Sequence, residues 1–456
     1  MIKISVFGQG KVGLTLTACL ADAGYDVTGV DVFDALIESV NEGNPRTDEA
    51  GVLERLRKNR AKVRATKDSM QAVKDTDLSF VIVPTPSNTL GGFSLKYVKK
   101  ACQEIGEALR KKRDYHVIAV ISTMIPGSSE HILIPLIEKA SGKKLGKGWG
   151  FCYNPVFIAL GEVVKGFVKP DYVLIGETDT RSGDRVLQVH RDMMKDTEEK
   201  TPIARMRPIE AEITKIASNT HETMRVSFAN MLFSLCTEIP ETNVDRITQA
   251  LSHRMGKRFF KGAVPYGGPC WPRDNIALAA FMDAVGVPSS MPKTVHQFNL
   301  EHGKYVLRKI LELTNAGDTI GIAGVAYKPN TPVLDCSFGV DLIGWLLEES
   351  RSVVAWDPLA KSLLESLMKN RIRYAATYAD LFDKTKTVVL VNPLEDYRNW
   401  DWRIVKNHVV IDCWRCLKPQ EIEKIKHYHP LGQGPASETK NFLEVLSMER
   451  LRMLTD

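Results

Sequence analysis

The sequence predicts an α/β protein in which two doubly wound α/β domains are joined by a mostly helical middle domain. Three observations lead to this prediction. The chain opens with a strand, a glycine turn, a helix and a second strand; a long helical stretch without glycine lies near its middle; and short apolar runs return towards its end. At 456 residues the chain is also too long for one ordinary core. We place the domain boundaries at residues 1–204, 205–312 and 313–456.

The first domain begins with a regular alternation of elements. Residues 2–7 are a short apolar run that predicts a buried strand, the turn Gly8-Gln-Gly-Lys-Val-Gly13 follows, and residues 14–23 are apolar at helical spacing. Residues 26–30 predict the next strand, which ends at Asp31. This order is the opening of a doubly wound sheet. Further strands are predicted at residues 78–83, 117–122 and 172–175, so we expect one parallel α/β domain.

The middle domain is predicted from a change in the pattern. Residues 209–239 contain no glycine and no interior proline, and they end before Pro240, which predicts one long helix or two in succession. Residues 276–285 and 295–313 also predict helices. A loop rich in Gly and Pro is expected at residues 262–273.

The third domain repeats the rhythm of the first and is expected to be Rossmann-like as well. Strands are predicted at residues 319–325, 353–356, 387–391 and 409–412. Residues 430–440 are rich in Gly, Pro, Ser and Lys and predict a mobile loop.

Composition excludes several classes of protein. Hydrophobic residues make up 44% and charged residues 25%, which is the balance of a globular chain. A net charge of +6 is small at this length, and the basic runs at 57–64 and 110–113 are interpreted as solvated helix faces, so we expect no nucleic-acid partner. The N-terminus has no signal-peptide pattern, and no run approaches the ~20 apolar residues of a membrane span, so we expect no membrane association.

The eight cysteines are scattered, which is typical of a reduced, cytoplasmic protein. Cys413 and Cys416 have C-x-x-C spacing, but there is no second pair and no His cluster nearby. A zinc site needs four ligands, so we expect no metal.

The glycine turn predicts a dinucleotide site. Gly8 permits a tight turn, Gly10 lets the backbone approach a pyrophosphate, and Gly13 allows the helix to pack close to the strand. The helix N-terminus offers N–H groups to the phosphates. Asp31 would accept hydrogen bonds from both ribose hydroxyls and repel a 2′-phosphate, which favours NAD over NADP. A purely structural glycine turn is the alternative.

Taken together, the motifs of the chain resemble those of the UDP-glucose/GDP-mannose dehydrogenase family over nearly its whole length. The order and approximate spacing of the landmarks match: Gly8–Gly13 with Asp31, Val83-Pro-Thr-Pro86, Ser122-Thr123, Asn154-Pro155, Glu212-Ile-Thr-Lys215 with Asn219, Tyr266-Gly-Gly-Pro-Cys-Trp-Pro-Arg-Asp274, Tyr327-Lys-Pro-Asn-Thr331 and Asp357-Pro358.

The resemblance implies a four-electron oxidation at C6 of a nucleotide sugar, with a UDP-hexose as the first choice. The alcohol becomes an aldehyde, a thiolate captures the aldehyde as a thiohemiacetal, and oxidation gives a thioester that water hydrolyses to the uronic acid. The matching thiol is Cys270, because a thiolate is both a strong nucleophile and a good leaving group. Pro269 and Pro272 stiffen its loop. For the other seven cysteines, a buried structural thiol is the expected role.

The resemblance also implies partners for Cys270. Lys215 and Asn219 are four residues apart, hence on one helix face, and would stabilise the oxyanion of each step. Asp274 would orient water or hold Lys215; the alternative is a structural ion pair between these two residues. Thr123 would bind the hydrolytic water.

Further site residues follow by the same resemblance. The predicted cofactor-binding residues are Gly8, Gly10, Lys11, Val12, Gly13, Asp31, Pro84, Thr85, Thr123 and Arg273. The predicted substrate-binding residues are Phe157, Lys215, Asn219, Arg254, Phe259, Phe260, Tyr266, Gly267 and Lys328. The basic stretch 254–261 would bind the diphosphate, and a solvated surface run is the alternative. The family pairs through its middle domain, which implies a homodimer with an apolar face on residues 209–240.

The chain departs from the family at several positions. The family's two glutamates in the N-P-E-F-L-x-E-G stretch are replaced by Val156 and Leu160, and its arginine after the third-domain Lys-Pro-Asn-Thr motif by Asp335. These departures leave two other hypotheses open: a UDP-N-acetylhexosamine 6-dehydrogenase, and a catalytically idle protein that binds a nucleotide sugar or NAD. A two-electron 3-hydroxyacid dehydrogenase needs no cysteine, so the 266–274 stretch argues against it.

Overall fold

The computed structural model describes residues 2–194, 200–405, 407–436 and 440–455. The chain divides into two compact units. We call Met1–Ser218 with Ala280–Val287 the N-terminal unit, and Asn219–Ala279 with Pro288–Asp456 the C-terminal unit. The three domain boundaries drawn from the sequence remain a prediction.

The N-terminal unit is built on an eight-stranded sheet with the order β3-β2-β1-β4-β5-β6-β7-β8. Its strands are β1 (Ile4–Phe7), β2 (Val27–Val30), β3 (Val63–Thr66), β4 (Leu78–Val81), β5 (His116–Val120), β6 (Trp149–Tyr153), β7 (Val173–Glu177) and β8 (Ile203–Met206). The pairs are parallel except that β6 and β7 run antiparallel. The expected parallel α/β domain is thus present, with one antiparallel pair that the sequence did not predict.

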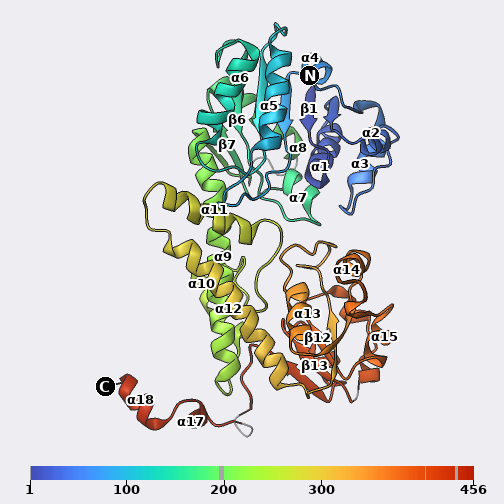
Figure 1. Ribbon diagram of the computed structural model, residues 1–456, viewed down its shortest axis with the longest axis vertical. Coiled ribbons are helices and arrows are strands. Elements are labelled where there is room, and N and C mark those ends of the chain that lie inside the picture. The colour runs from blue at the N-terminus through green and yellow to red at the C-terminus, as the bar shows by residue number, and fades with distance from the viewer. Residues whose placement is uncertain (1, 195–199, 406, 437–439, 456) are drawn as a thin grey trace. The chain divides into compact units, whose positions relative to one another are not determined.

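Helices cover both faces of this sheet (Figure 1). One buried core lies under α1 (Lys11–Asp22), α3 (Val52–Lys58), α7 (Val163–Val168) and α8 (Thr180–Met194). A second lies under α4 (Ser69–Asp75), α5 (Lys96–Leu109) and α6 (Ile134–Ser141). The short α2 (Asp34–Asn41) follows Asp31, and a single π turn, Ser129–Leu133, leads into α6.

The long helix α9 (Pro208–Glu238) is unbroken, which decides between the two readings of residues 209–239. The boundary between the two units falls within it, after Ser218. Three more helices follow: α10 (Val244–Met255), α11 (Trp271–Ala284) and α12 (Ser290–Glu312). Helix α11 begins inside the stretch predicted as a loop, because a proline in the first turn, here Pro272, gives up no helical hydrogen bond.

The C-terminal unit contains a parallel six-stranded sheet with the order β11-β10-β9-β12-β13-β14. The strands are β9 (Thr319–Ala323), β10 (Ser352–Trp356), β11 (Arg373–Tyr374), β12 (Thr387–Leu390), β13 (Val409–Asp412) and β14 (His427–Pro430). The helices after β9 are α13 (Phe338–Glu348), α14 (Lys361–Met368), α15 (Tyr378–Asp383), α16 (Pro419–Ile422), α17 (Phe442–Val445) and α18 (Met448–Thr455).

The loop predicted at residues 430–440 begins where β14 ends, at Pro430, and residues 437–439 lie outside the described part of the chain. Five strands were not predicted from the sequence: β3, β6, β8, β11 and β14. β3 is only half buried and β11 is two residues long, so neither has a continuous apolar run.

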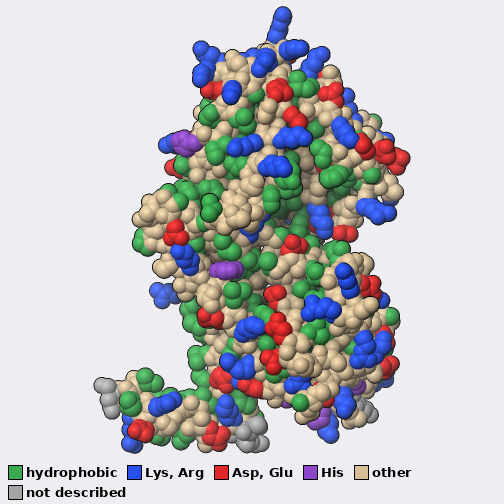
Figure 2. Space-filling model, viewed as in Figure 1, with side chains coloured by type: hydrophobic (Ala, Val, Ile, Leu, Met, Phe, Trp, Pro, Cys, Tyr) green, Lys and Arg blue, Asp and Glu red, His purple; other side chains and the backbone are tan. Residues whose placement is uncertain are grey.

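On the face in Figure 2, Lys and Arg side chains are interspersed with Asp and Glu. Within the described residues, no helix combines the length and apolarity that crossing a bilayer requires.

Candidate functional site

In the N-terminal unit, the predicted cofactor residues follow the carboxyl ends of neighbouring strands. Gly8 follows β1, Asp31 follows β2, Pro84 and Thr85 come after β4, and Thr123 comes after β5. The strand order reverses between β1 and β4. In open α/β sheets, ligands bind in the crevice at such a switch point, at the carboxyl edge.

The three glycines of the first turn have different geometry. Gly8 has φ +96, and a Cβ there would lie 2.5 Å from the Ile82 carbonyl oxygen. A Cβ on Gly13 would lie 1.9 Å from the Gly8 carbonyl oxygen, so only glycine lets α1 pack this close to the turn. A Cβ on Gly10 would meet nothing within 4 Å. The space beside Gly10 is therefore open, as a dinucleotide pyrophosphate requires.

The Asp31 carboxylate is fixed beside this turn. One oxygen accepts the backbone N–H of Gln9 at 2.7 Å, and the other accepts those of Val32 at 2.7 Å and Phe33 at 3.2 Å. A carboxylate has about four acceptor sites, so this one keeps capacity for a further donor such as a ribose hydroxyl. Lys11, at the start of α1, forms an exposed ion pair with Asp48 at 3.2 Å, and Val12 is half buried.

Buried Glu212 holds the chain that follows Thr123. Its carboxylate accepts the N–H of Gly127 at 2.6 Å, and the N–H and hydroxyl of Ser129 at 2.9 and 2.7 Å. Burial raises the pKa of this carboxyl, and the hydrogen bonds from Ser129 and Gly127 oppose that rise. The loop after β5 is thus anchored to the first turns of α9.

The stretch that departs from the family lies at the end of β6. The Lys215 ammonium donates to the Val156 carbonyl oxygen at 3.0 Å and lies 4.6 Å from the centre of the Phe157 ring. Phe157 in turn stacks on Tyr172. The Val156 side chain packs against the core, so its backbone carbonyl, rather than a side-chain carboxylate, meets Lys215.

Leu160, the second apolar replacement, also packs against the core. The loop here is held by Glu49, whose buried carboxylate accepts the N–H of Gly161 at 2.7 Å and of Val163 at 3.2 Å. Glu162 is exposed and pairs with Lys165. Glu49 lies far from this loop in sequence, so no local sequence pattern predicted these hydrogen bonds.

In the C-terminal unit, Cys270 is exposed and stands at the start of α11, where its carbonyl accepts the Asp274 N–H at 2.8 Å. The N-terminal end of a helix stabilises nearby negative charge. Burial raises the pKa of Cys19 and Cys102 to about 12. Cys336 is also exposed, so the expectation of a buried thiol is wrong there, although burial and the nearby Asp341 and Asp335 raise its pKa.

The Asp274 carboxylate lies beside Cys270 in sequence and is fully buried. It accepts a hydrogen bond from the Asn219 amide at 2.6 Å and one from the Arg273 guanidinium at 3.3 Å. The amide of Asn219 has a second N–H, so it can still donate to another group. The structure therefore brings Asn219, Asp274 and Arg273 together at the start of α11.

The loop before Cys270 packs against the loop that follows β9. The Gly268 N–H donates to the Asp335 carbonyl at 3.0 Å, and a Cβ on Gly268 would lie 2.6 Å from the Tyr327 ring. A Cβ on Gly267 would lie 2.1 Å from the Cys336 carbonyl oxygen. These contacts bring the stretch around Tyr266 and Gly267 against the segment that carries Lys328.

Tyr266 itself is buried, and its hydroxyl accepts from the Asn275 amide at 3.0 Å. The basic stretch 254–261 lies just upstream. Its Arg254, Lys257, Arg258 and Lys261 are exposed, whereas Phe260 is buried. Arg258 pairs with Glu222 at 3.9 Å, and the four side chains together place positive charge at the surface of one short segment, which suits an anionic ligand.

The predicted residues therefore fall into two groups. The N-terminal unit carries Lys215, Phe157, Thr123 and the cofactor residues before them; the C-terminal unit carries the rest. Sequence reasoning missed residues that hold the C-terminal group in place, notably Arg225, Asn230 and Asn299. Their side chains donate hydrogen bonds to backbone carbonyls that are distant in sequence. The only signal in the sequence was a polar residue within a helical stretch. Among the described residues, no cluster of three or more His, Cys, Asp or Glu is placed to hold a metal ion.

The N-terminal unit has a glycine turn with an aspartate after the second strand, and the C-terminal unit has an exposed thiol at the start of α11. These features define the class as a dinucleotide-dependent dehydrogenase. Comparison with known families agrees. Residues 2–194 match the NAD binding domain of the UDP-glucose/GDP-mannose dehydrogenase family, residues 209–301 its central domain, and residues 321–419 its UDP binding domain. The chain belongs to the UDP-glucose/GDP-mannose dehydrogenase family, and its cofactor is NAD.

Individual relatives support the assignment. The chain is 31% identical to a GDP-mannose 6-dehydrogenase of Pseudomonas aeruginosa over 78% of this chain and 81% of that protein. It is 28% identical to a UDP-glucose 6-dehydrogenase of Haloferax volcanii over 92% and 98%. Among solved structures, a UDP-glucose dehydrogenase of Pyrobaculum islandicum superposes with a TM-score of 0.86 at 27% identity, covering 95% of this chain and 98% of that one.

Proposed function

We propose that the chain catalyses the NAD-dependent four-electron oxidation of the C6 hydroxymethyl group of a nucleotide sugar, a UDP-hexose foremost, to the uronic acid. The observation that carries this proposal is Cys270, an exposed thiol at the start of α11 with the buried Asn219–Asp274 pair in the first turn that follows. The predicted sites and domain boundaries are part of this proposal.

The chemistry balances as two oxidations and one hydrolysis. The alcohol loses a hydride and a proton and becomes an aldehyde. The Cys270 thiolate adds to the aldehyde carbon, and the oxygen takes up a proton, which gives a thiohemiacetal. Loss of a second hydride and of that proton gives a thioester. Water then adds to the carbonyl carbon, and cleavage of the carbon–sulfur bond releases the acid and the thiol.

NAD+ would be held by the Gly8–Gly13 turn and Asp31 and, when bound, would supply the hydride acceptor for both oxidations, so two NADH would form for each sugar. We assign the side chains of the protein to charge and to water. Lys215 and Asn219 donate to the oxygen that becomes negative when the thiolate or the water adds. Asp274 and Thr123 orient the attacking water. Arg254 and its neighbours, with Lys328, bind the diphosphate and nucleotide.

One observation supports a second candidate for the sugar. The positions of both family glutamates carry side chains packed against the core, Val156 and Leu160, so the loop after β6 presents no carboxylate from these two positions. A less charged loop suits a neutral N-acetyl group, and a UDP-N-acetylhexosamine is therefore the second candidate substrate.

The test is NADH formation, followed by absorbance, with a panel of UDP-, GDP-, TDP- and AMP-linked sugars. We expect a UDP-sugar to be the best substrate and to yield two NADH per molecule. A yield of one NADH would contradict the four-electron scheme. NADH from none of the panel would contradict the proposed substrate class and favour the idle protein.

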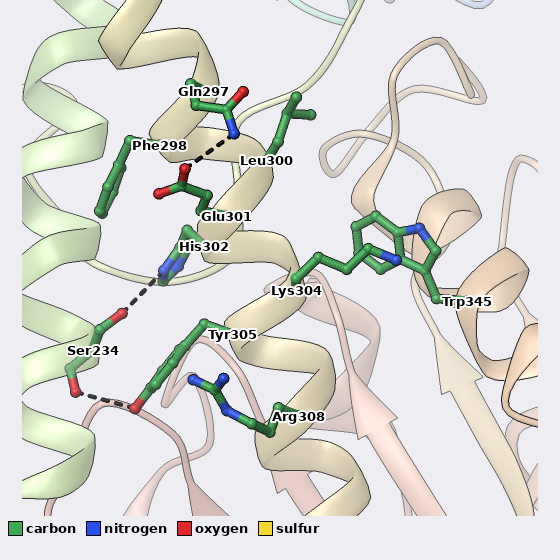
Figure 3. A pocket seen from close by; sticks show the side chains of 10 residues that line it. All are labelled: Ser234, Gln297, Phe298, Leu300, Glu301, His302, Lys304, Tyr305, Arg308 and Trp345. Carbon is green, nitrogen blue, oxygen red and sulfur yellow. Dashed lines mark hydrogen bonds between the residues drawn. The ribbon is translucent and has the colours of Figure 1, made fainter.

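We also propose a cytoplasmic homodimer that forms through the middle helices. Phe228, Met231 and Leu235 on α9 are 39%, 45% and 53% exposed at helical spacing. Ser234 of α9 also lines a hollow of about 640 Å³, together with Gln297, Phe298, Leu300, Glu301, His302, Lys304, Tyr305, Arg308 and Trp345 (Figure 3). An apolar face of this kind fits a second copy of the chain.

Light scattering should give twice the chain mass of 50.9 kDa. The double variant Met231→Lys with Leu235→Lys should give a monomer, because four charges would face one another in the interface. A single-chain mass for the unaltered protein would contradict the dimer.

A further inference from the structure

The last turn of α10 carries the exposed Arg254, and the segment between α10 and the Cys270 loop carries the exposed Lys257 and Arg258 but has little regular structure of its own. Residues 256–260 form turns and bends. If this segment binds a diphosphate, as the proposed function holds, its backbone must be fixed by something outside it. The inference below rests on that proposed function.

One side chain of α9, Arg225, makes three hydrogen bonds to this backbone. Its Nη1 donates to the Met255 carbonyl at 2.7 Å, its Nη2 to the Gly256 carbonyl at 2.7 Å, and its Nε to the Arg258 carbonyl at 2.9 Å. The guanidinium also lies 5.4 Å from the centre of the Phe260 ring. All the nitrogens of one rigid, planar group are thus directed at a single turn of chain.

The contacts suit arginine and not lysine. The planar fork of a guanidinium can donate to three carbonyls at once, whereas an ammonium is a compact point charge on a flexible stem. The carbonyls of Met255 and Gly256 also belong to the C-terminal end of α10, where a cation is favoured by the helix dipole. Arg225 therefore caps α10 and holds the chain that leaves it.

One residue next to the backbone that Arg225 holds is strained. Gly256 has φ +78, which glycine adopts without strain, whereas Phe259, directly after Arg258, has φ +53, a left-handed conformation that a bulky side chain rarely adopts. Strain of this kind persists where the surrounding structure enforces it, and it clusters at ligand-binding segments. The Phe259 ring packs edge-on against Trp271, next to Cys270, and the Arg258 guanidinium lies 4.9 Å from the centre of the Phe259 ring.

We propose that Arg225 is a positioning residue for nucleotide-sugar binding: it fixes the backbone of residues 255–258 so that Arg254, Lys257 and Arg258 present their charges to the substrate diphosphate. It acts through these residues and does not touch the reacting carbon. Its loss is therefore expected to weaken binding of the diphosphate and to leave the chemistry at Cys270 in place.

The experiment compares Arg225→Met and Arg225→Lys with the unaltered enzyme. For Arg225→Met we expect the KM for the nucleotide sugar, and the Kd for UDP measured by calorimetry, to rise about tenfold or more, as for the loss of charge-assisted contacts. The kcat and the KM for NAD should change less than about threefold. Arg225→Lys should lie between the two, because it keeps the charge and loses the fork.

Two controls make the result decisive. Arg246→Met removes an exposed arginine from α10 and should change none of these constants. Uridine, which lacks the phosphates, should bind Arg225→Met and the unaltered enzyme within about twofold of each other, because the cations act on phosphate oxygens.

The inference is overturned if Arg225→Met lowers kcat at unchanged KM, or if uridine and UDP lose affinity equally. A thermal midpoint for Arg225→Lys close to that of the unaltered enzyme shows that this variant is folded; unchanged UDP affinity in it and in Arg225→Met would also overturn the inference. An unaltered enzyme that oxidises no nucleotide sugar contradicts the proposed function instead, and UDP binding would still test Arg225.

Discussion

The two sheets begin in the same way but have different aspartates after their second strands. β1, a turn, α1 and β2 lead to Asp31; β9, a longer loop, α13 and β10 lead to Asp357. In both, a glycine lets the helix approach the turn: a Cβ on Gly13 would lie 1.9 Å from Gly8, and one on Gly339 would lie 2.8 Å from the Val325 backbone. The shared frame shows that topology alone does not define a dinucleotide site.

The two aspartates differ in how many hydrogen bonds their carboxylates already accept. Asp357 is buried and accepts four backbone N–H groups, from Val325 and Ala326 on one oxygen and from Leu359 and Ala360 on the other. With about four acceptor sites all engaged, Asp357 has nothing left for a ribose. Asp31 accepts three N–H groups and is partly exposed. Asp31 therefore keeps capacity for a further donor, whereas Asp357 is fully engaged in fixing a loop.

The largest effect on stability is expected from replacing Asp357, whose carboxylate accepts four backbone N–H groups. Asp357→Ala leaves four backbone donors without a partner and should lower the free energy of unfolding by about 3–5 kcal/mol. Thermal and chemical denaturation would measure it. Asp31→Ala is the matched control and should cost less than about 1 kcal/mol, since two of the three amides that its carboxylate accepts belong to the exposed Val32 and Phe33. Equal losses in the two variants would contradict the comparison.

The next largest effect is expected in how the free energy of unfolding depends on pH, with one buried histidine contributing in each unit. Burial lowers the pKa of His190 in the N-terminal unit and of His302 in the C-terminal unit to about 4. Between about pH 6.5 and 4 the unfolded chain binds protons that the folded chain does not, so stability falls as the pH falls through this window. At pH 5 each histidine should cost up to about 2 kcal/mol.

Denaturation midpoints of His190→Gln and His302→Gln at pH 7 and pH 5 would measure the contributions. Each variant should lose part of the pH dependence of the unaltered chain. A pH dependence as steep as that of the unaltered chain in both variants would show that other groups cause it.

Cofactor choice should respond to Asp31 alone. Asp31→Ser should raise the KM for NAD about tenfold, since a charged acceptor for the ribose is lost, and should improve the ratio of kcat/KM for NADP to that for NAD. Steady-state kinetics with both cofactors would measure this. If Asp357→Ser shifted the ratio as much, Asp31 would not be the ribose ligand.

The smallest effect is expected at Gly10. Because a Cβ there meets nothing within 4 Å, Gly10→Ala should fold normally and raise the KM for NAD by a few fold, through crowding of the bound pyrophosphate. Gly13→Ala, whose Cβ would overlap the Gly8 carbonyl, should instead lower the yield of folded protein. A normal KM for NAD in Gly10→Ala would mean that the cofactor lies away from this turn.

Local patterns predicted much of the fold. The strand–turn–helix–strand opening at Gly8 and the helical character of residues 209–239 could be predicted because periodicity and glycine spacing are properties of neighbouring residues, whereas the choice between one helix and two came from the structure. The antiparallel pairing of β6 with β7 could not, because pairing direction depends on how distant segments meet.

The site divides in the same way. Cys270 could be predicted as a candidate nucleophile because its loop has a distinctive sequence. The structure adds that its backbone carbonyl accepts the Asp274 N–H at the start of α11. Glu49, Arg225 and Asp357 act on backbone atoms that tertiary folding brings to them, so their roles were invisible in the sequence. The exposure of Cys336 likewise depends on its loop.

The proposed function requires Cys270 to carry the sugar as a thioester during the four-electron oxidation. This role is tested by measuring the uronic acid and NADH made from one UDP-sugar by the unaltered enzyme and by Cys270→Ser. We expect two NADH and one acid per sugar from the unaltered enzyme, and from Cys270→Ser a reaction that stalls or stops at the aldehyde. Full acid production by Cys270→Ser would rule out the thioester.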